Sequence, residues 1–147
     1  MRKINDILKQ CAVIEVIGDN DRLVSGLAFD SRKCTDGMAF FAIRGTQVDG
    51  HDFIDKVVEQ GTKVIVCEHI PSVMADDVTY YVVDDTAKSL GYAASEFYGR
   101  PSEKLRLVGV TGTNGKTTIA TLLYRLFFNA GYPCGLLSTI ENRINDI

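Results

Sequence analysis

The segment Thr111–Thr118 carries the strongest chemical signal in the chain, and it reads T-G-T-N-G-K-T-T. It lies between an apolar run that predicts a strand and a periodic pattern that predicts a helix. A polyphosphate needs backbone N–H groups that point inward, and Gly112 and Gly115 leave room for its close approach. A helix that begins near Lys116 adds free N–H groups and the positive end of its dipole. The segment therefore predicts a phosphate-binding loop for a nucleoside triphosphate.

The side chains of this loop have the chemistry that a triphosphate and Mg²⁺ require. Lys116 can reach the β- and γ-phosphates as a point charge. Thr117 can place its hydroxyl on Mg²⁺, and neighbouring polar side chains can add hydrogen bonds. The predicted nucleotide-binding residues are Gly112, Thr113, Asn114, Gly115, Lys116, Thr117 and Thr118. The loop indicates nucleotide binding but does not by itself indicate a reaction.

One position departs from the general phosphate-loop pattern. Val110 stands where that pattern has a glycine, so the loop is a relaxed version of it. The alternative is an ordinary glycine-rich turn between a strand and a helix. We favour the phosphate loop because G-K-T-T falls at the point where a strand must give way to a helix.

Strand-like and helix-like segments alternate along the chain, which predicts an α/β fold. The predicted strands are residues 11–17, 23–29, 38–43, 63–68 and 79–83, and the predicted helices are residues 3–10, 53–60 and 87–98. The short polar stretch 99–104 contains Pro101 and predicts a domain boundary. We therefore expect one domain of residues 1–100 and a second of residues 101–147.

The second domain is predicted to contain a strand at 105–110, a helix at 116–129 and a strand that begins at 134. These elements are too few for a complete nucleotide-binding domain, so we expect the sequence to stop inside it. The apolar side of the helix should then be exposed. That side consists of Ile119, Leu122, Leu123, Leu126 and Phe127.

Composition excludes several classes of protein. The 147 residues are 46% hydrophobic and 24% charged, which excludes a disordered chain. A net charge of −3 makes nucleic-acid binding a poor hypothesis. No apolar run suits a membrane span or a secretory signal, so we expect a cytoplasmic protein. The four cysteines are widely spaced, which argues against a zinc site and favours reduced thiols.

A second group of motifs lies in the first domain. It comprises D-S-R at 30–32, G-M-A-F-F-A at 37–42, Gly45, and D-G-H-D-F-I at 49–54. Together with the loop 109–118, these motifs resemble the Mur ligase family in order and spacing. Its members are ATP-dependent amino-acid ligases that build peptidoglycan precursors. Thr113 and Ser31 resemble the members that add the third amino acid more closely than those that add D-Ala-D-Ala.

The resemblance implies that the first domain is a UDP-binding α/β domain, which holds UDP-MurNAc-dipeptide. The matching positions are Phe29, Ser31, Thr46, Gln47 and Val48. Ser31 could instead be a turn residue that bonds its own backbone. Arg32 could pair with Asp30 or with phosphate. For His51 we expect a role at the entry to a helix, with Asp52 as a possible cap.

The implied reaction uses ATP and Mg²⁺ and proceeds through an acyl phosphate. Lys116 is the expected catalytic residue because it would stabilise charge on the transferred phosphoryl group, and Thr117 is the expected Mg²⁺ ligand. Meso-diaminopimelate and L-lysine both remain open as the added amino acid. We expect no activity from these 147 residues alone and a monomeric whole enzyme. The alternative to an enzyme is a non-catalytic module that binds a nucleotide.

Overall fold

The computed structural model describes residues 1–46 and 48–145, and the chain divides into two compact units. Unit 1 is Met1–Leu105 and unit 2 is Arg106–Ile147. The division falls between residues 105 and 106, two residues after the 3₁₀ helix η2 (Pro101–Glu103) and just beyond the polar stretch 99–104. None of the described helices is long and apolar enough to cross a membrane.

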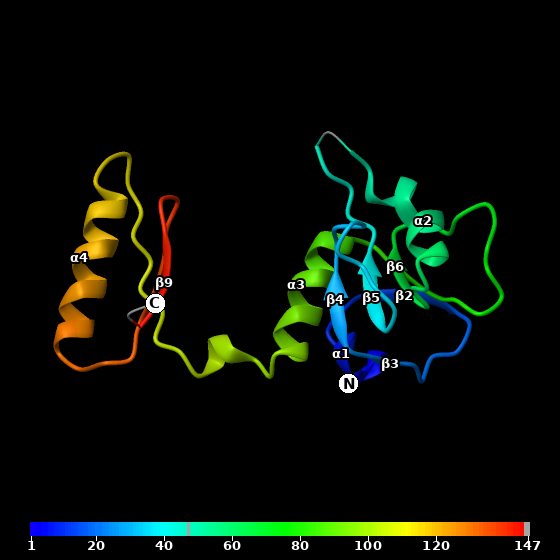
Figure 1. The fold of residues 1–147 in the computed structure, drawn as a ribbon, viewed down its shortest axis with the longest axis horizontal. Helices are drawn as coiled ribbons and strands as arrows, with labels where there is room; N and C mark the ends of the chain where they lie inside the picture. Colours follow the sequence, from blue (N-terminus) through cyan, green and yellow to red (C-terminus); the bar gives the residue numbers. More distant parts are fainter. Residues whose placement is uncertain (47, 146–147) are drawn as a thin grey trace. The chain divides into compact units, whose positions relative to one another are not determined.

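Unit 1 contains a five-stranded sheet, as expected of an α/β domain (Figure 1). Its strands, in spatial order, are β2 (Val13–Ile17), β7 (Thr79–Val83), β6 (Val64–Cys67), β5 (Met38–Phe41) and β4 (Gly26–Ala28). The strands β4 to β7 are parallel, whereas β2 lies antiparallel to β7 at one edge. The short strands β1 (Arg2–Lys3) and β3 (Leu23–Val24) pair in a separate antiparallel ribbon.

Helices cover both faces of this sheet, which explains the continuous apolar runs of its central strands. The helices α1 (Ile4–Ile7) and α3 (Thr86–Phe97) lie on one face, and η1 (Gly50–Phe53) with α2 (Ile54–Glu59) lies on the other (Figure 1). In β5, Ala39 and Phe41 enter the first core, while Phe40 enters the second. Successive residues of one strand thus supply two separate cores.

The predicted strand at 23–29 is interrupted at Ser25, which separates β3 from β4. The backbone N–H of Ser25 donates to the Gly37 carbonyl at 2.7 Å, and its hydroxyl donates to the same oxygen at 3.1 Å. This anchor bends the chain, so β3 pairs with β1 while β4 joins β5. The sequence shows the apolar pattern but not this contact between distant residues.

Unit 2 contains α4 (Lys116–Asn129) and the antiparallel hairpin of β8 (Gly135–Leu137) and β9 (Asn142–Ile144). The prediction of a strand at 105–110 is wrong, because a strand needs a neighbour and none among the described residues pairs with this segment. The strand predicted from residue 134 is short. Its chain turns back at Ser138, whose hydroxyl donates to the Glu141 carbonyl at 2.8 Å.

The predicted exposure of the apolar side of α4 is confirmed for Ile119, Leu122, Leu126 and Phe127, whereas Leu123 is half-buried. Ile119 is 49% exposed and Leu126 is 63% exposed. Leu122 and Phe127 are exposed as well, and Tyr124 is the buried residue of this helix. The helix therefore keeps its shape while most of its apolar surface meets solvent.

Candidate functional site

The phosphate loop adopts the backbone that its glycines allow. Gly112 has a φ of 145° and Gly115 a φ of 75°, and side-chain-bearing residues rarely adopt either value. Gly115 is also the N-cap of α4, so no side chain closes the end of the helix. The N–H groups of the first turn, Lys116–Thr118, consequently remain available to an anion.

The side chain of Lys116 folds back over this loop. Its ammonium donates to the carbonyl of Gly112 and lies 3.4 Å from the carbonyl of Thr113. The predicted nucleotide-binding residues 112–118 thus form one continuous, solvent-facing turn at the head of α4. Thr117 is half-buried in that first turn, and the other members are exposed.

The residues predicted to bind the UDP-linked substrate gather at the carboxyl ends of neighbouring parallel strands. Phe29 and Ser31 follow β4, whereas Thr46 and Val48 lie in the segment that follows β5. Gln47 lies outside the described residues. In open α/β sheets, ligands bind in the crevice beyond the carboxyl ends of the strands. The fold therefore brings together two segments that are separate in sequence.

Ser31 is 8% exposed, and its hydroxyl makes no hydrogen bond with any described residue. The turn is instead held by Asp30, whose carboxylate accepts the Arg32 backbone N–H at 3.0 Å. The Ser31 hydroxyl is thus not used for the turn, which was the alternative role for this residue. It remains open to a ligand.

Arg32 pairs with Asp30, which is one of the two partners that the sequence left open. The guanidinium donates to both carboxylate oxygens, at 2.9 and 2.8 Å. These contacts and the backbone N–H of Arg32 lower the pKa of Asp30 to about 2. The Arg32 side chain is nevertheless 81% exposed, so it can still meet an anion from solvent.

His51 lies at the entry to a helix as expected, but Asp52 is not the cap. The 3₁₀ helix η1 begins at Gly50, which places the cap at Asp49. The Asp49 carboxylate accepts the His51 backbone N–H at 2.9 Å and lies 2.6 Å from Nδ1 of the same histidine. Both N–H contacts lower the pKa of Asp49 to about 2.

Sequence reasoning missed two polar residues at this edge, Glu68 and Thr86. Glu68 follows β6, and its carboxylate accepts the backbone N–H of Thr86 at 3.1 Å. The Thr86 hydroxyl lies 3.0 Å from the Ala42 carbonyl just beyond β5. The sequence signal for Glu68 was its position as a charged residue directly after a buried strand. Its partner Thr86 is far from it in sequence, so the contact itself could not be predicted.

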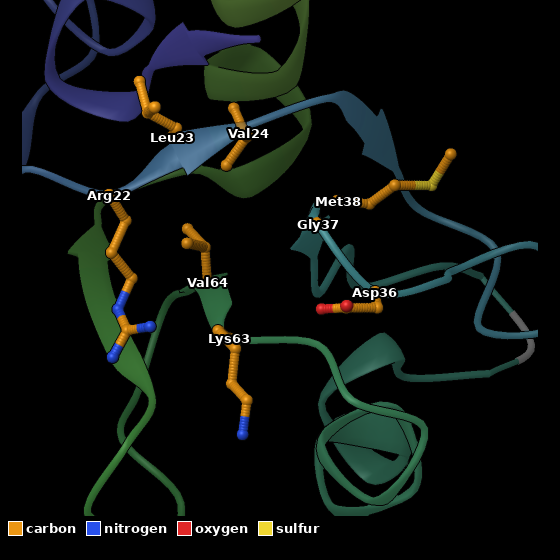
Figure 2. Close-up of a pocket in the computed structure, with 8 residues that line it drawn as sticks. All are labelled: Arg22, Leu23, Val24, Asp36, Gly37, Met38, Lys63 and Val64. Atoms are coloured by element: carbon orange, nitrogen blue, oxygen red, sulfur yellow. The ribbon is translucent and has the colours of Figure 1, made fainter.

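A hollow of about 230 Å³ lies at the opposite end of the sheet, near the starts of β5 and β6 (Figure 2). Its cationic residues already have partners. The Arg22 guanidinium donates to Thr79 and to the Asp77 carbonyl, and the Lys63 ammonium pairs with the Asp77 carboxylate. We therefore place the candidate site at the carboxyl edge, where Ser31 has no such partner.

Two models of known protein families match this chain. The model described as "Mur ligase family, catalytic domain" matches residues 23–98, and that described as "Mur ligase middle domain" matches residues 110–147. The chain belongs to the Mur ligase family. The two matches fall in unit 1 and unit 2, respectively.

Among proteins of this family, several that bear one name are highly similar to this chain. A protein of Phocaeicola vulgatus is 49% identical over 98% of this chain, and one of Cytophaga hutchinsonii is 50% identical over 98%. Both are named UDP-N-acetylmuramoyl-L-alanyl-D-glutamate–2,6-diaminopimelate ligase. The chain spans 30% of the length of each of these relatives.

Solved structures show the same fold. A 2,6-diaminopimelate ligase of this type superposes with a TM-score of 0.72, at 24% identity, over 99% of this chain and 29% of its own. The MurF ligase of Thermotoga maritima, solved in complex with ADP, gives a TM-score of 0.55 at 32% identity. That match covers 76% of this chain and 25% of the ligase.

Proposed function

We propose that this chain is part of an ATP-dependent ligase that adds 2,6-diaminopimelate to UDP-N-acetylmuramoyl-L-alanyl-D-glutamate. The observation that carries the proposal is 49–50% identity, over nearly the whole chain, to relatives that bear this name. The same similarity favours diaminopimelate over L-lysine and over the D-Ala-D-Ala dipeptide. ATP is the proposed co-substrate, which is consistent with a cytoplasmic reaction.

We assign different substrates to the two units. Unit 1 would hold the UDP-linked dipeptide through Phe29, Ser31 and the segment that contains Thr46 and Val48. The unpartnered Ser31 hydroxyl supports this assignment because it can donate to a phosphate oxygen. Phe29 is 64% exposed at the end of β4, which leaves its backbone and ring accessible to a nucleoside.

The phosphate loop of unit 2 fits ATP by its donor set. The uncapped first turn of α4 offers backbone N–H groups, and Lys116 adds a cation directly beside them. A Cβ at Gly115 would meet no atom within 4 Å, so its positive φ rather than crowding explains the glycine there. Thr117 would hold Mg²⁺, which supplies charge neutralisation when it is bound.

In the proposed reaction, the terminal carboxylate of the dipeptide attacks the γ-phosphorus, and ADP leaves. The amine of diaminopimelate then displaces phosphate from the resulting acyl phosphate and loses a proton. Lys116 and the N–H groups of the loop would stabilise charge on the transferred phosphoryl group. Ser31 and its neighbours would position the substrate without taking part in bond making.

Calorimetric titration with UDP-MurNAc-L-Ala-D-Glu tests the assignment of unit 1. The Ser31→Ala variant loses one hydrogen bond to a charged phosphate, so its Kd for this substrate should be roughly 5- to 50-fold higher than that of the unaltered chain. Ser102→Ala is the matched control, because Ser102 is exposed in η2. The assignment would be wrong if the folded chain bound no substrate, or if both variants bound it equally well.

A further inference from the structure

We propose that His51 is a positioning residue, which shapes the 44–49 loop (Arg44–Asp49) so that it receives the UDP-linked substrate. This inference rests on the proposed function, because that function gives Thr46 and Val48 a substrate to contact. His51 itself would touch no reacting atom. It would act through the loop that precedes it.

Both ring nitrogens of His51 are engaged. The imidazole is 5% exposed, and Nε2 accepts the backbone N–H of Glu68 at 2.9 Å. A backbone N–H can only donate, so Nε2 carries no proton and Nδ1 must carry it. Nδ1 then donates to the Asp49 carboxylate, 2.6 Å away. The two contacts fix one neutral tautomer and one ring orientation.

The Asp49 end of this bridge closes the 44–49 loop. The Asp49 carboxylate also accepts from the Arg44 guanidinium at 3.3 Å, so it ties the two ends of the loop together. Within the loop, the Gly45 N–H donates to the Val48 carbonyl at 3.0 Å. Thr46 lies between these two bonded residues, at the tip of the loop.

The Glu68 end anchors the bridge to the sheet. Glu68 directly follows β6, and its carboxylate holds the backbone N–H of Thr86 at the start of α3. The Thr86 hydroxyl reaches the Ala42 carbonyl, immediately before the segment that leads into the loop. His51 thus connects a surface loop with the ends of β5, β6 and β7. His69 stacks on its ring, with centroids 4.1 Å apart.

Removal of the His51 side chain should make the 44–49 loop less ordered without unfolding the core. In His51→Ala, the Glu68 N–H loses its acceptor and the Asp49 carboxylate loses one donor. We expect hydrogen exchange at the Gly45 amide to accelerate roughly 10-fold, and the Kd for the UDP-linked substrate to rise roughly 10-fold. His51→Gln, whose side-chain oxygen can accept from Glu68, should recover part of both losses.

The experiment uses the 147-residue chain and measures two quantities. Hydrogen exchange at Gly45, followed by NMR without ligand, reports the order of the loop. Calorimetry with UDP-MurNAc-L-Ala-D-Glu reports binding. Val57→Ala is the control for stability, because Val57 is fully buried in the core beneath α2 and is not one of the described residues whose hydrogen bonds hold the loop. It should lower the melting temperature and leave both measured quantities as in the unaltered chain.

The outcomes separate this inference from the proposed function. Substrate binding that is equal in the unaltered chain and His51→Ala would overturn the inference alone. A folded, unaltered chain that binds no substrate would overturn the proposed function, whatever the exchange at Gly45. If Val57→Ala weakens binding as much as His51→Ala, general destabilisation explains the loss and the inference fails. If His51→Ala does not fold, His51→Gln takes its place. Its exchange at Gly45 and its substrate affinity are then compared with those of Val57→Ala, and the outcomes are judged in the same way.

Discussion

The two units differ in what supports their candidate sites. In unit 1, the segments around Ser31 and the 44–49 loop follow strands of a sheet that is covered on both faces. In unit 2, the predicted phosphate loop is preceded by a segment that pairs with no described strand, and it is followed by a helix with an exposed apolar side. The site with the clearer sequence motif therefore has the weaker packing around it.

This difference follows from the two kinds of geometry. A phosphate loop depends on consecutive residues: two glycines with positive φ, one lysine and the first turn of a helix. Neighbouring residues can specify it with little help from a core. The candidate substrate site of unit 1 is made from strand ends that only the completed sheet brings together. No local sequence motif marks its residues as a site, and only the fold places them near one another.

Removal of one aromatic side chain from each unit should give the largest difference between the units, measured as the loss in free energy of unfolding. Phe40 is fully buried between the sheet and α2, so Phe40→Ala should lower the free energy of unfolding of unit 1 by about 3–5 kcal/mol. Phe127 is 43% exposed, so Phe127→Ala should cost under about 1 kcal/mol. Urea unfolding monitored by circular dichroism measures both. Similar losses would contradict the difference in packing.

Lys116→Ala tests whether the exposed loop of unit 2 functions without a surrounding core. Loss of a charged contact to phosphate should weaken the binding of ATP with Mg²⁺ roughly 10- to 100-fold. Lys104→Ala is the matched control, since Lys104 is exposed and outside the loop. Calorimetry gives both affinities, and equal binding by the two variants would remove Lys116 from the site.

Acid titration should reveal a smaller effect that is confined to unit 1. The folded-state pKa of Asp49 is about 2, below the ordinary value of 3.8, because the carboxylate accepts N–H bonds from His51. The stability that it contributes is therefore complete above about pH 5 and disappears as the pH falls towards 2. Asp49→Asn should be less stable at neutral pH by under about 1 kcal/mol, given its partial exposure.

Thermal unfolding between pH 7 and pH 2 measures this effect. The difference in melting temperature between the unaltered chain and Asp49→Asn should shrink steadily below about pH 4. Asp76→Asn, in the exposed loop between β6 and β7, serves as the control. A difference that stays constant down to pH 2 would show that the charge of Asp49 contributes no stability.

Local patterns predicted the elements that depend on neighbouring residues. The strand at 79–83 and the helix at 116–129 have the predicted bounds, because each combines a clear apolar pattern with a flanking turn. Predictions failed where a distant partner decides the structure. The segment 105–110 has the composition of a strand, but no described strand pairs with it. Ser25 interrupts another run because Gly37 holds it.

The candidate sites follow the same division. The predicted phosphate loop is recognisable from consecutive residues, whereas the proposed roles of Ser31 and His51 depend on distant segments. The Asp49 cap differs from the expected Asp52 because η1 begins earlier than the predicted helix. The contact between His51 and the Glu68 N–H joins residues from two separate elements, so no spacing rule could have indicated it.

The position of β2 in the sheet has a consequence for synthesis of the chain. This strand comprises residues 13–17, yet its pairing partner is β7 at residues 79–83. The Tyr81 hydroxyl also bonds the Asn5 side chain at 3.1 Å, and α1 packs against α3. A ribosome would thus release the first strand long before its partner exists. Native structure in unit 1 should appear in a single late step, after α3 has emerged, and truncations before Phe97 should not fold.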